Sequence, residues 1–210
     1  MVIESTRNET VKRARALAQR KGRLEQGVHF IEGEKLVREA VVSGAQFVDA
    51  FIEDGHDLMA AVLSGSGANV YTVRRSVMES LTQTGTPQWV CATVKTPEQP
   101  IPEYYPAGLI VALDCVQDPG NLGTILRTAD AMGACGLLLG EGCADPYAPK
   151  PLRAAMGSIY HIPVWQGNLE NEVARLAAQG FTLVCGHLKG ADVLPEPGEK
   201  LSLIHISEPT

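Results

Sequence analysis

The sequence predicts an α/β protein of two domains, and three observations lead to this expectation. Short apolar runs that suit strands alternate with segments whose apolar residues recur at helical spacing, which is typical of layered α/β domains. The chain has 210 residues, 45% hydrophobic and 20% charged, which is enough for two small cores. Residues 96–108 contain four prolines, which interrupt the alternation and read as a linker between the two halves.

The first half, residues 1–95, is expected to begin with a helix. Asn8 is a suitable N-cap, and Val11, Ala14 and Leu17 fall on one helical face. The basic stretch 21–23 contains a glycine and is expected to end this helix in a flexible turn. Strands are then expected at Val28–Ile31, Phe47–Ile52, Val70–Val73 and Trp89–Val94, and helices at Glu34–Ser43, Asp57–Leu63 and Arg75–Leu81.

After a linker at 96–107, the second domain is expected to occupy residues 108–200. Its first strand, Leu109–Leu113, is apolar throughout, which suits a strand buried on both faces of a sheet. The remaining expected strands are Gly136–Leu139, Ile162–Val164 and Phe181–Cys185, and the expected helices are Asn121–Met132, Pro151–Met156 and Leu169–Gln179.

The charge of the chain is unevenly distributed. Residues 1–24 contain seven basic and two acidic groups, a balance of +5, so the net charge of −6 leaves −11 for the rest. A local basic surface of this kind suits a polyanion such as RNA. A solvated helix face would give the same pattern, and this alternative stays open.

The composition also excludes several classes of protein. The amino terminus has no apolar core after its positive charges, so it is not a signal peptide, and no apolar run is long enough to cross a membrane. The five cysteines are scattered without a C-x-x-C pair, so we expect buried, reduced thiols in a cytoplasmic protein rather than disulfides or zinc. Four histidines also lack metal-ligand or triad spacing and are expected to be structural or exposed: His29, His56, His161 and His187. No metal site is predicted.

The strongest signal lies in residues 111–133, VALDCVQDPGNLGTILRTADAMG. The sequence from Asp118 to Asn121 is typical of a tight turn between a buried strand and a helix. Gly123 is costly in a first helical turn unless something approaches its backbone closely. The junction also places free N–H groups at a helix N-terminus, which favours a phosphate. Asn121 and Arg127 are candidates for one cleft, although a turn followed by a surface arginine would look the same.

In context, LDCVQDPGNLGTILRTADAMGA resembles the first signature motif of the SpoU (TrmH) family of the SPOUT methyltransferases. Residues 145–164, DPYAPKPLRAAMGSIYHIPV, are similar to the next stretch of that family. The amino-terminal half resembles the family's substrate-binding domain, which has a ribosomal-protein-like α/β fold. The residues that match this domain are Asn8, Lys12, Lys21, Gly22, Arg23 and Glu32 to Glu34. The resemblance covers about residues 4–200.

This resemblance implies a SPOUT domain of the α/β knot type that transfers a methyl group. The donor would be S-adenosylmethionine, and the acceptor a ribose 2'-hydroxyl of structured RNA, ribosomal or transfer RNA. Arg127 would be the catalytic residue nearest the chemistry, since a permanently charged guanidinium favours alkoxide character at the hydroxyl, and Asn121 would orient the site. A homodimer is also implied, and Ala155 departs from the hydroxyl residue common at that position. The RNA-binding candidates are Lys12, Lys21, Arg23, Lys150 and Arg153.

The sequence departs from the family at its end. Two further motifs that form the donor pocket, one resembling G-x-E-G-x-G and one with a Pro-rich turn before Ser-Leu-Asn, are absent. Only Gly186 and His187, after an expected strand, are candidates to border this pocket. Residues 201–210 are expected to be a non-native tail, with a natural short ending as the alternative. The chain as printed is therefore expected to bind the donor poorly and to be inactive.

Two other functions stay open at this point. A noncatalytic RNA-binding module would keep the substrate domain and lose donor binding. A nucleotide-binding Rossmann enzyme is less well supported, because no G-x-G-x-x-G follows an expected strand.

Overall fold

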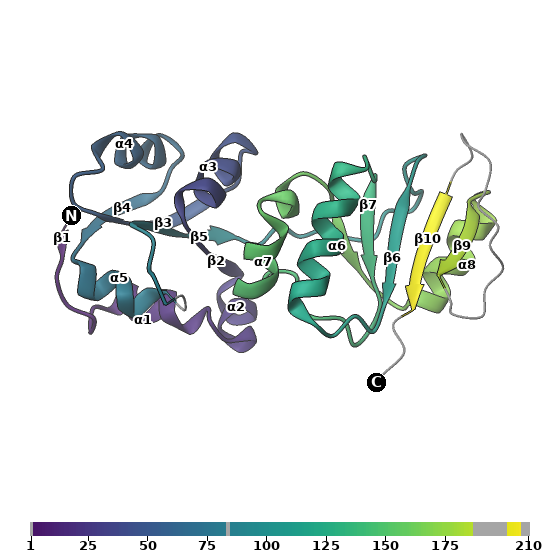
Figure 1. The fold of residues 1–210 in the computed structure, drawn as a ribbon, viewed down its shortest axis with the longest axis horizontal. Coiled ribbons are helices and arrows are strands. Elements are labelled where there is room, and N and C mark those ends of the chain that lie inside the picture. The colour runs from purple at the N-terminus through teal and green to yellow at the C-terminus, as the bar shows by residue number, and fades with distance from the viewer. Residues whose placement is uncertain (1, 83–84, 187–200, 207–210) are drawn as a thin grey trace.

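The protein folds into two α/β lobes that lie side by side along its longest axis (Figure 1). The computed structural model describes residues 2–82, 85–186 and 201–206. Each lobe contains a five-stranded sheet. Across the described part of the chain, no helix has the length and apolar character to cross a membrane.

The sheet of the first lobe is mixed and has the order β1-β4-β3-β5-β2. β1, β4 and β3 run parallel, whereas β5 pairs antiparallel with both β3 and β2. The strands are β1 (Val2–Ile3), β2 (Val28–Glu32), β3 (Phe47–Glu53), β4 (Asn69–Val73) and β5 (Val90–Lys95), and the helices are α1 (Glu9–Ala16), α2 (Arg20–Gln26), α3 (Glu34–Val42), α4 (Asp57–Gly65) and α5 (Arg75–Leu81). This is a three-layer sandwich, because α1 and α5 pack on one face of the sheet and α3 and α4 on the other.

The start of the chain folds largely as its sequence predicts. The Asn8 side chain caps α1 by accepting a hydrogen bond from the Thr10 N–H at 2.8 Å, and Val11 and Ala14 are buried. The expected flexible turn at residues 21–23 is wrong, because these residues belong to α2. Gly22 allows α2 to pack closely against the end of α1, because a Cβ at this position would lie 2.7 Å from the Ala16 carbonyl carbon.

The sheet of the second lobe has the order β8-β7-β6-β10-β9, and its neighbouring strands are all parallel. The strands are β6 (Ile110–Asp114), β7 (Gly136–Leu139), β8 (Val164–Gln166), β9 (Thr182–Gly186) and β10 (Leu201–Ile206), and the helices are α6 (Pro119–Ala131), α7 (Pro149–Ala155), the 3-10 turn η1 (Ser158–Tyr160) and α8 (Leu169–Ala178). The segment 201–206, which we expected to lie outside the fold, therefore forms a strand between β6 and β9.

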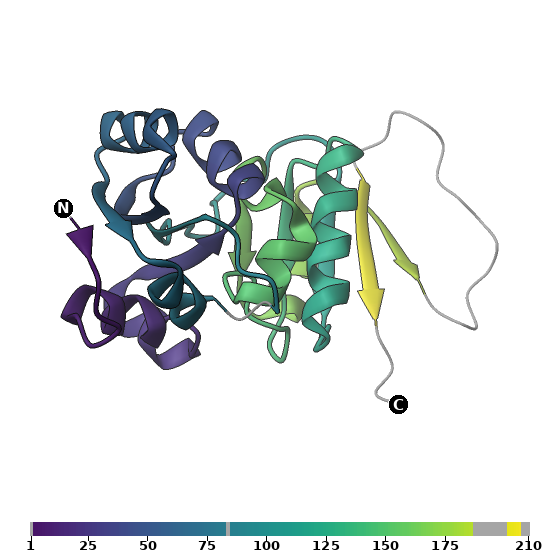
Figure 2. The ribbon, with the colours of Figure 1, turned by 60° about the vertical axis from the view of Figure 1, so that its left-hand side comes forward.

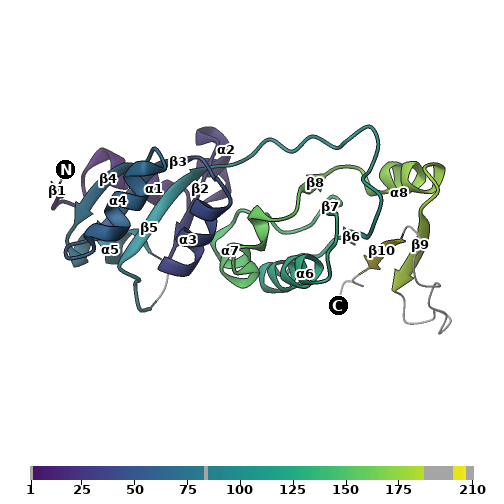
Figure 3. The ribbon, with the colours of Figure 1, turned by 90° about the horizontal axis from the view of Figure 1, so that it is seen from above.

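Helices cover both faces of the second sheet (Figure 3). Alternate residues of β6 point to opposite faces, so Val111 and Leu113 pack with α6 and α7, and Ile110 and Ala112 pack in the cluster that includes Leu176 of α8. The proline-rich linker runs on the α8 side (Figure 3). It has no regular structure but is held in place: the Gln99 side chain accepts the Val164 N–H at 2.7 Å, and Arg175 donates to the Pro102 carbonyl at 2.7 Å.

The two lobes share an apolar core. One cluster of buried residues contains Ile31, Leu36 and Val37 of the first lobe together with Leu122, Leu126 and Leu152 of the second. Helix α7 joins the lobes, because it packs on α6 and also contacts β2 (Figure 2). The expectation of buried thiols holds for Cys91 and is wrong for Cys115 and Cys185, which are exposed.

Candidate functional site

The motif segment builds the junction between β6 and α6. Asp118 is the N-cap of α6, and its Oδ1 accepts the Asn121 N–H at 2.8 Å, while Pro119 occupies the first turn. The Lys150 ammonium at the start of α7 donates to Asp118 Oδ2 at 3.3 Å. The Asn121 N–H and then Lys150 hold the pKa of Asp118 below its usual value. The carboxylate therefore stays charged and fixes the turn that presents α6.

Gly123 is explained by packing between helices. A Cβ at this position would lie 2.5 Å from the Pro151 carbonyl oxygen and 2.6 Å from the Ala154 Cβ. The glycine thus lets α7 approach α6 closely, and Ala155, fully buried in α7, belongs to the same contact. The backbone approach that the sequence predicts at Gly123 comes from another helix.

Asn121 and Arg127 both lie on the exposed face of α6. They are six positions apart in the sequence, which places them about 9 Å apart along the helix axis and roughly 120° apart around it. They are therefore at opposite edges of this face, and Arg127 is within the helix rather than at the junction with β6. The exposed residues between these two edges are Thr124, Thr128 and Ala131.

Arg127 is one of seven described cations whose side chains have no partner. Across the described residues, its guanidinium forms neither an ion pair nor a hydrogen bond, although most other cations are paired. The described cations that share this property are Arg7, Arg15, Arg20, Lys35, Lys95, Arg127 and Arg153, all exposed. An unpaired, exposed guanidinium is available to an anionic ligand without first losing an internal contact.

The predicted RNA-binding residues divide into three groups: three paired lysines, the unpaired Arg153, and the buried Arg23. Lys12, Lys21 and Lys150 are exposed but pair with Glu9 at 2.7 Å, Glu25 at 3.7 Å and Asp118 at 3.3 Å. Exposed pairs of this kind are weak, so these lysines remain accessible. Arg153 is exposed and unpaired.

Arg23 does not lie on the RNA-facing surface that the sequence predicts. It is only 6% exposed, and it donates to Asp145 Oδ2 of the second lobe at 2.6 Å and to the Leu17 carbonyl oxygen at 2.6 Å. A buried arginine held by a carboxylate and backbone carbonyls is a structural bridge between domains. The prediction that Arg23 contacts an RNA phosphate from an exposed surface is therefore wrong.

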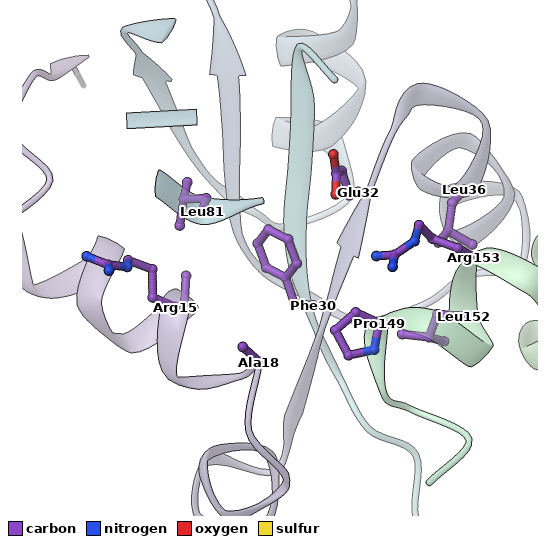
Figure 4. Close-up of a pocket in the computed structure, with 10 residues that line it drawn as sticks. Arg15, Ala18, Phe30, Glu32, Leu36, Leu81, Pro149, Leu152 and Arg153 are labelled. Carbon is purple, nitrogen blue, oxygen red and sulfur yellow. The ribbon is translucent and has the colours of Figure 1, made fainter. Parts of the chain in front are cut away.

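Arg15 and Arg153 flank a small cavity between the lobes (Figure 4). Arg15 comes from α1 and Arg153 from α7, and Phe30 of β2 lies between them (Figure 4). The other residues around the cavity are Ala14, Ala18, Glu32, Leu36, Leu81, Pro149 and Leu152. Unpaired cations from both domains thus border one apolar opening, and Arg15 was not among the residues that sequence reasoning selected.

Two histidines have larger structural roles than their sequence spacing suggested. His29 is buried and hydrogen-bonds to Thr96 at 3.1 Å and to Tyr160 of the second lobe at 2.9 Å. Burial lowers the pKa of His29 to about 3, so its ring is neutral. His161 contacts Asp130 at 2.7 Å and Glu39 of the first lobe at 2.8 Å. Both histidines therefore join the two lobes.

The carboxyl ends of the parallel strands meet at one edge of the second sheet, where open α/β sheets place their ligands. At this edge Asp114 ends β6, Gly140 follows β7, and Gly186 ends β9. His187 lies outside the described residues. No cluster of potential metal ligands occurs among the residues searched, which are those that the structure describes.

Comparison with known proteins identifies both lobes. Residues 108–204 match the SpoU rRNA Methylase family, and residues 8–92 match an MRM3-like substrate binding domain. The chain is 38% identical over 178 residues to the 23S rRNA (guanosine(2553)-2'-O)-methyltransferase RlmP of Bacillus subtilis (strain 168). That alignment covers 85% of this chain and 70% of the relative.

Solved structures agree over nearly the whole chain. The crystal structure of an rRNA methyltransferase from Sinorhizobium meliloti superimposes with a TM-score of 0.89 at 33% identity, covering 98% of this chain and 81% of that one. The AdoMet-bound structure from the same organism gives 0.87 at 34% identity, with coverage of 97% and 80%. The unpaired arginine of the motif helix, the two-lobed fold and these similarities lead to one conclusion: the chain belongs to the SpoU rRNA methylase family.

Proposed function

We propose that the protein transfers a methyl group from S-adenosylmethionine to a ribose 2'-hydroxyl of ribosomal RNA. The observation that carries this proposal is Arg127, an exposed and unpaired guanidinium on the motif helix of a chain similar to a 23S rRNA 2'-O-methyltransferase. The alternative of a noncatalytic RNA-binding module is not supported, because the relatives are named as methyltransferases and one solved relative is bound to AdoMet.

Arg127 is the proposed catalytic residue. A ribose hydroxyl is a poor nucleophile, and a guanidinium beside it stabilises the negative charge that develops on its oxygen as the methyl group is transferred. The planar fork of arginine can bind the neighbouring phosphate at the same time. The side chain of Asn121, at the other edge of the exposed face of α6, is proposed to orient the RNA through its amide.

The donor is proposed to bind at the carboxyl edge of the second sheet, where Gly186 and His187 are candidates to border it. Asp114 is the last residue of β6 at this edge, and Glu141 lies two residues beyond the end of β7. Carboxylates at this position suit a donor that carries a positively charged sulfonium group. S-adenosylmethionine supplies the methyl group, while the protein holds and orients the two substrates.

The RNA is proposed to lie across both lobes. Arg153 supports this path, because it is unpaired and shares a cavity with Arg15 of the other domain. Lys12, Lys21 and Lys150 are proposed to add phosphate contacts by exchanging their weak surface pairs. Because the protein is acidic overall, binding would depend on this local surface rather than on net charge.

A homodimer is also proposed, formed through the middle of the exposed face of α6, so that Asn121 and Arg127 at its two edges stay outside the contact. This face carries small, uncharged residues at Thr124, Thr128 and Ala131, and Met132 at its end is 71% exposed. Small residues allow two helices to approach closely, and an exposed apolar side chain favours burial. Sedimentation of the wild-type protein would test this state. A cytoplasmic location is proposed as well, although some relatives are named as mitochondrial.

The test of the function is methyl transfer to ribosomal RNA by the protein expressed from its complete reading frame. Arg127→Ala should lower the rate about 10²- to 10³-fold, as is typical when an electrostatic group of a transition state is removed. The measurement is incorporation of a radiolabelled methyl group, with 2'-O-methylribose identified by mass spectrometry. Arg7→Ala, which removes another exposed and unpaired arginine, should keep the wild-type rate. Near-normal transfer by Arg127→Ala would contradict the assignment of this residue.

A further inference from the structure

A second opening between the lobes is larger and more polar than the cavity at Arg15. It has a volume of about 640 Å³, within the range of roughly 300–1,000 Å³ that is usual for ligand sites. One wall is formed by Arg20 and Leu24 of α2 and by Lys95 at the end of β5. The other wall is formed by residues of the second lobe: Leu139, Gly140, Cys143, Ala144, Val164 and Gln166. We call this opening the interdomain groove.

The interdomain groove leads from the substrate-binding domain to the edge of the sheet where ligands bind. Gly140 directly follows β7, and Gln166 ends β8. The carboxyl ends of parallel strands are where open α/β sheets place their ligands. A strand of RNA held in this groove would therefore be guided from the first lobe toward the edge of the second sheet.

The floor of the interdomain groove is preformed. Arg23 and Asp145 line it and form the 2.6 Å bridge between the lobes, so the charge of each is neutralised by the other. The linker forms another part of the lining, and it is fixed because the Gln99 side chain accepts a hydrogen bond from the Val164 N–H at 2.7 Å. Tyr147 also lines the groove, and its buried hydroxyl bonds to no described residue. A rigid site of this kind loses little entropy on binding.

The charge that remains at the rim is positive. Arg20 and Lys95 are exposed, and neither forms an ion pair or hydrogen bond through its side chain with any residue that the structure describes. Glu98 is the exposed carboxylate of the lining, and Asp145 is already paired. Two free cations thus face one free carboxylate, which favours a ligand with closely spaced negative charges.

We propose that the interdomain groove binds a segment of the substrate RNA, with Arg20 and Lys95 contacting its phosphates. This inference rests on the proposed function, which makes RNA the substrate, and it adds a binding site that includes neither Arg127 nor the motif helix. The groove holds a part of the RNA other than the reacting nucleotide, so its residues contribute to RNA affinity and to the position of the strand.

The first experiment measures RNA binding as a function of salt. A fluorescein-labelled RNA hairpin with a single-stranded loop is titrated with wild-type protein and with the double variant Arg20→Gln/Lys95→Gln. The variant should bind at least about tenfold more weakly, and the slope of log affinity against log salt should fall by about two, roughly one for each phosphate contact. Arg7→Gln/Arg74→Gln makes the same change of charge at the β1 end of the first lobe and should leave the slope unchanged.

The second experiment locates the RNA by photo-cross-linking. Leu24 is 71% exposed and lines the groove, whereas Leu58 is 87% exposed and lies on α4, at the far end of the first lobe (Figure 1). A photoreactive amino acid at position 24 should cross-link to the hairpin, and the same amino acid at position 58 should not. Because both side chains are largely exposed, neither replacement should disturb folding.

The outcomes separate this inference from the proposed function. If the wild-type protein binds the hairpin while the groove variant keeps its affinity and slope, the groove proposal is overturned and the methyltransferase assignment stands. Cross-linking at position 58 as strong as at position 24 would also overturn it. If the wild-type protein binds no RNA, both proposals fail.

Discussion

Individual residues of the motif segment have separable roles, and Gly123 is the one whose role is most directly structural. Its missing side chain leaves room for the backbone of α7, since an added Cβ would lie 2.5 Å from the Pro151 carbonyl oxygen. Conformational freedom is not the reason for this glycine, because it lies within a regular helix.

Gly123→Ala should therefore destabilise the protein, by about 1–3 kcal/mol, as is usual for overpacking in a well-packed core. The measurement is the free energy of unfolding from urea denaturation. The matched control is Gly65→Ala, in which a helical glycine with no atom within 4 Å of its added Cβ is changed. That change should be neutral or slightly stabilising, because alanine is the better helix former. Equal effects of the two substitutions would show that α7 does not press on Gly123.

At the residue scale, the sequence shows where the charged residues are but does not predict which of them are unpaired. Lys12 and Arg15 are three positions apart and look equivalent in the sequence, yet Lys12 pairs with Glu9 and Arg15 is unpaired. Arg23 looks like a surface cation but is buried against Asp145, a residue far away in the chain. Ion pairing across domains depends on tertiary contacts, so Arg15, Arg20 and Lys95 could be found only in the structure.

Several elements meet at His161, which follows η1. Its Nδ1 lies 2.7 Å from Asp130 of α6, and its Nε2 lies 2.8 Å from Glu39 of α3. Hydrogen bonds to Asp130 and then to Glu39 raise the pKa of His161 above its ordinary value of 6.5, against a smaller opposing effect of burial. The protonated ring can donate to both carboxylates, whereas the neutral ring can donate to only one.

The contribution of His161 to stability should thus depend on pH. A raised pKa in the folded state means that the stabilisation is fully present below the unfolded pKa of about 6.5 and is lost as pH rises through the folded value. The difference in unfolding free energy between the wild type and His161→Gln should accordingly shrink as pH increases above about 6.5. Urea denaturation at several pH values measures this difference, from which the effect of His29 cancels because both proteins contain it.

A second background tests the cause of this dependence. When Glu39→Gln and Asp130→Asn are already present, replacing His161 should change stability by an amount that varies little with pH. If replacing His161 changed the unfolding free energy with the same pH dependence in both backgrounds, the two carboxylates would not be what raises the pKa of His161.

At the element scale, periodicity predicted most helices and strands, and the errors have physical causes. Residues 21–23 looked like a turn because they are basic and contain Gly22, but they lie in α2, where Gly22 allows close packing on α1. The strand β8 is displaced by two residues from its expected position, since Ile162 is buried by tertiary contacts before the strand begins. Burial outside regular structure cannot be distinguished from a short strand by hydrophobicity alone.

At the scale of the whole molecule, the two lobes form one unit held by a shared apolar core and a buried ion pair. The Arg23 side chain is 7% exposed and that of Asp145 is 20% exposed. Removing one member of such a pair leaves the other charge buried without compensation, which is among the most costly single changes in a protein.

Asp145→Ala should consequently lower the free energy of unfolding by roughly 3 kcal/mol. The control is Glu25→Ala, which breaks the exposed pair with Lys21 at 3.7 Å and should change stability by less than about 0.5 kcal/mol. Thermal or urea unfolding of both variants measures these effects. If Asp145→Ala were no more destabilising than Glu25→Ala, the bridge between the lobes would be energetically unimportant.

The position of β10 has a consequence for the order in which the protein can fold. In the second sheet β9 contacts no other described strand except β10, and β10 also pairs with β6. During synthesis, β6, β7 and β8 can pair as soon as they leave the ribosome, because they are adjacent in both the chain and the sheet. β9 must wait for residues 201–206 before it has a partner. β9 therefore joins the sheet only after these residues have emerged, whereas the first lobe can fold while translation continues.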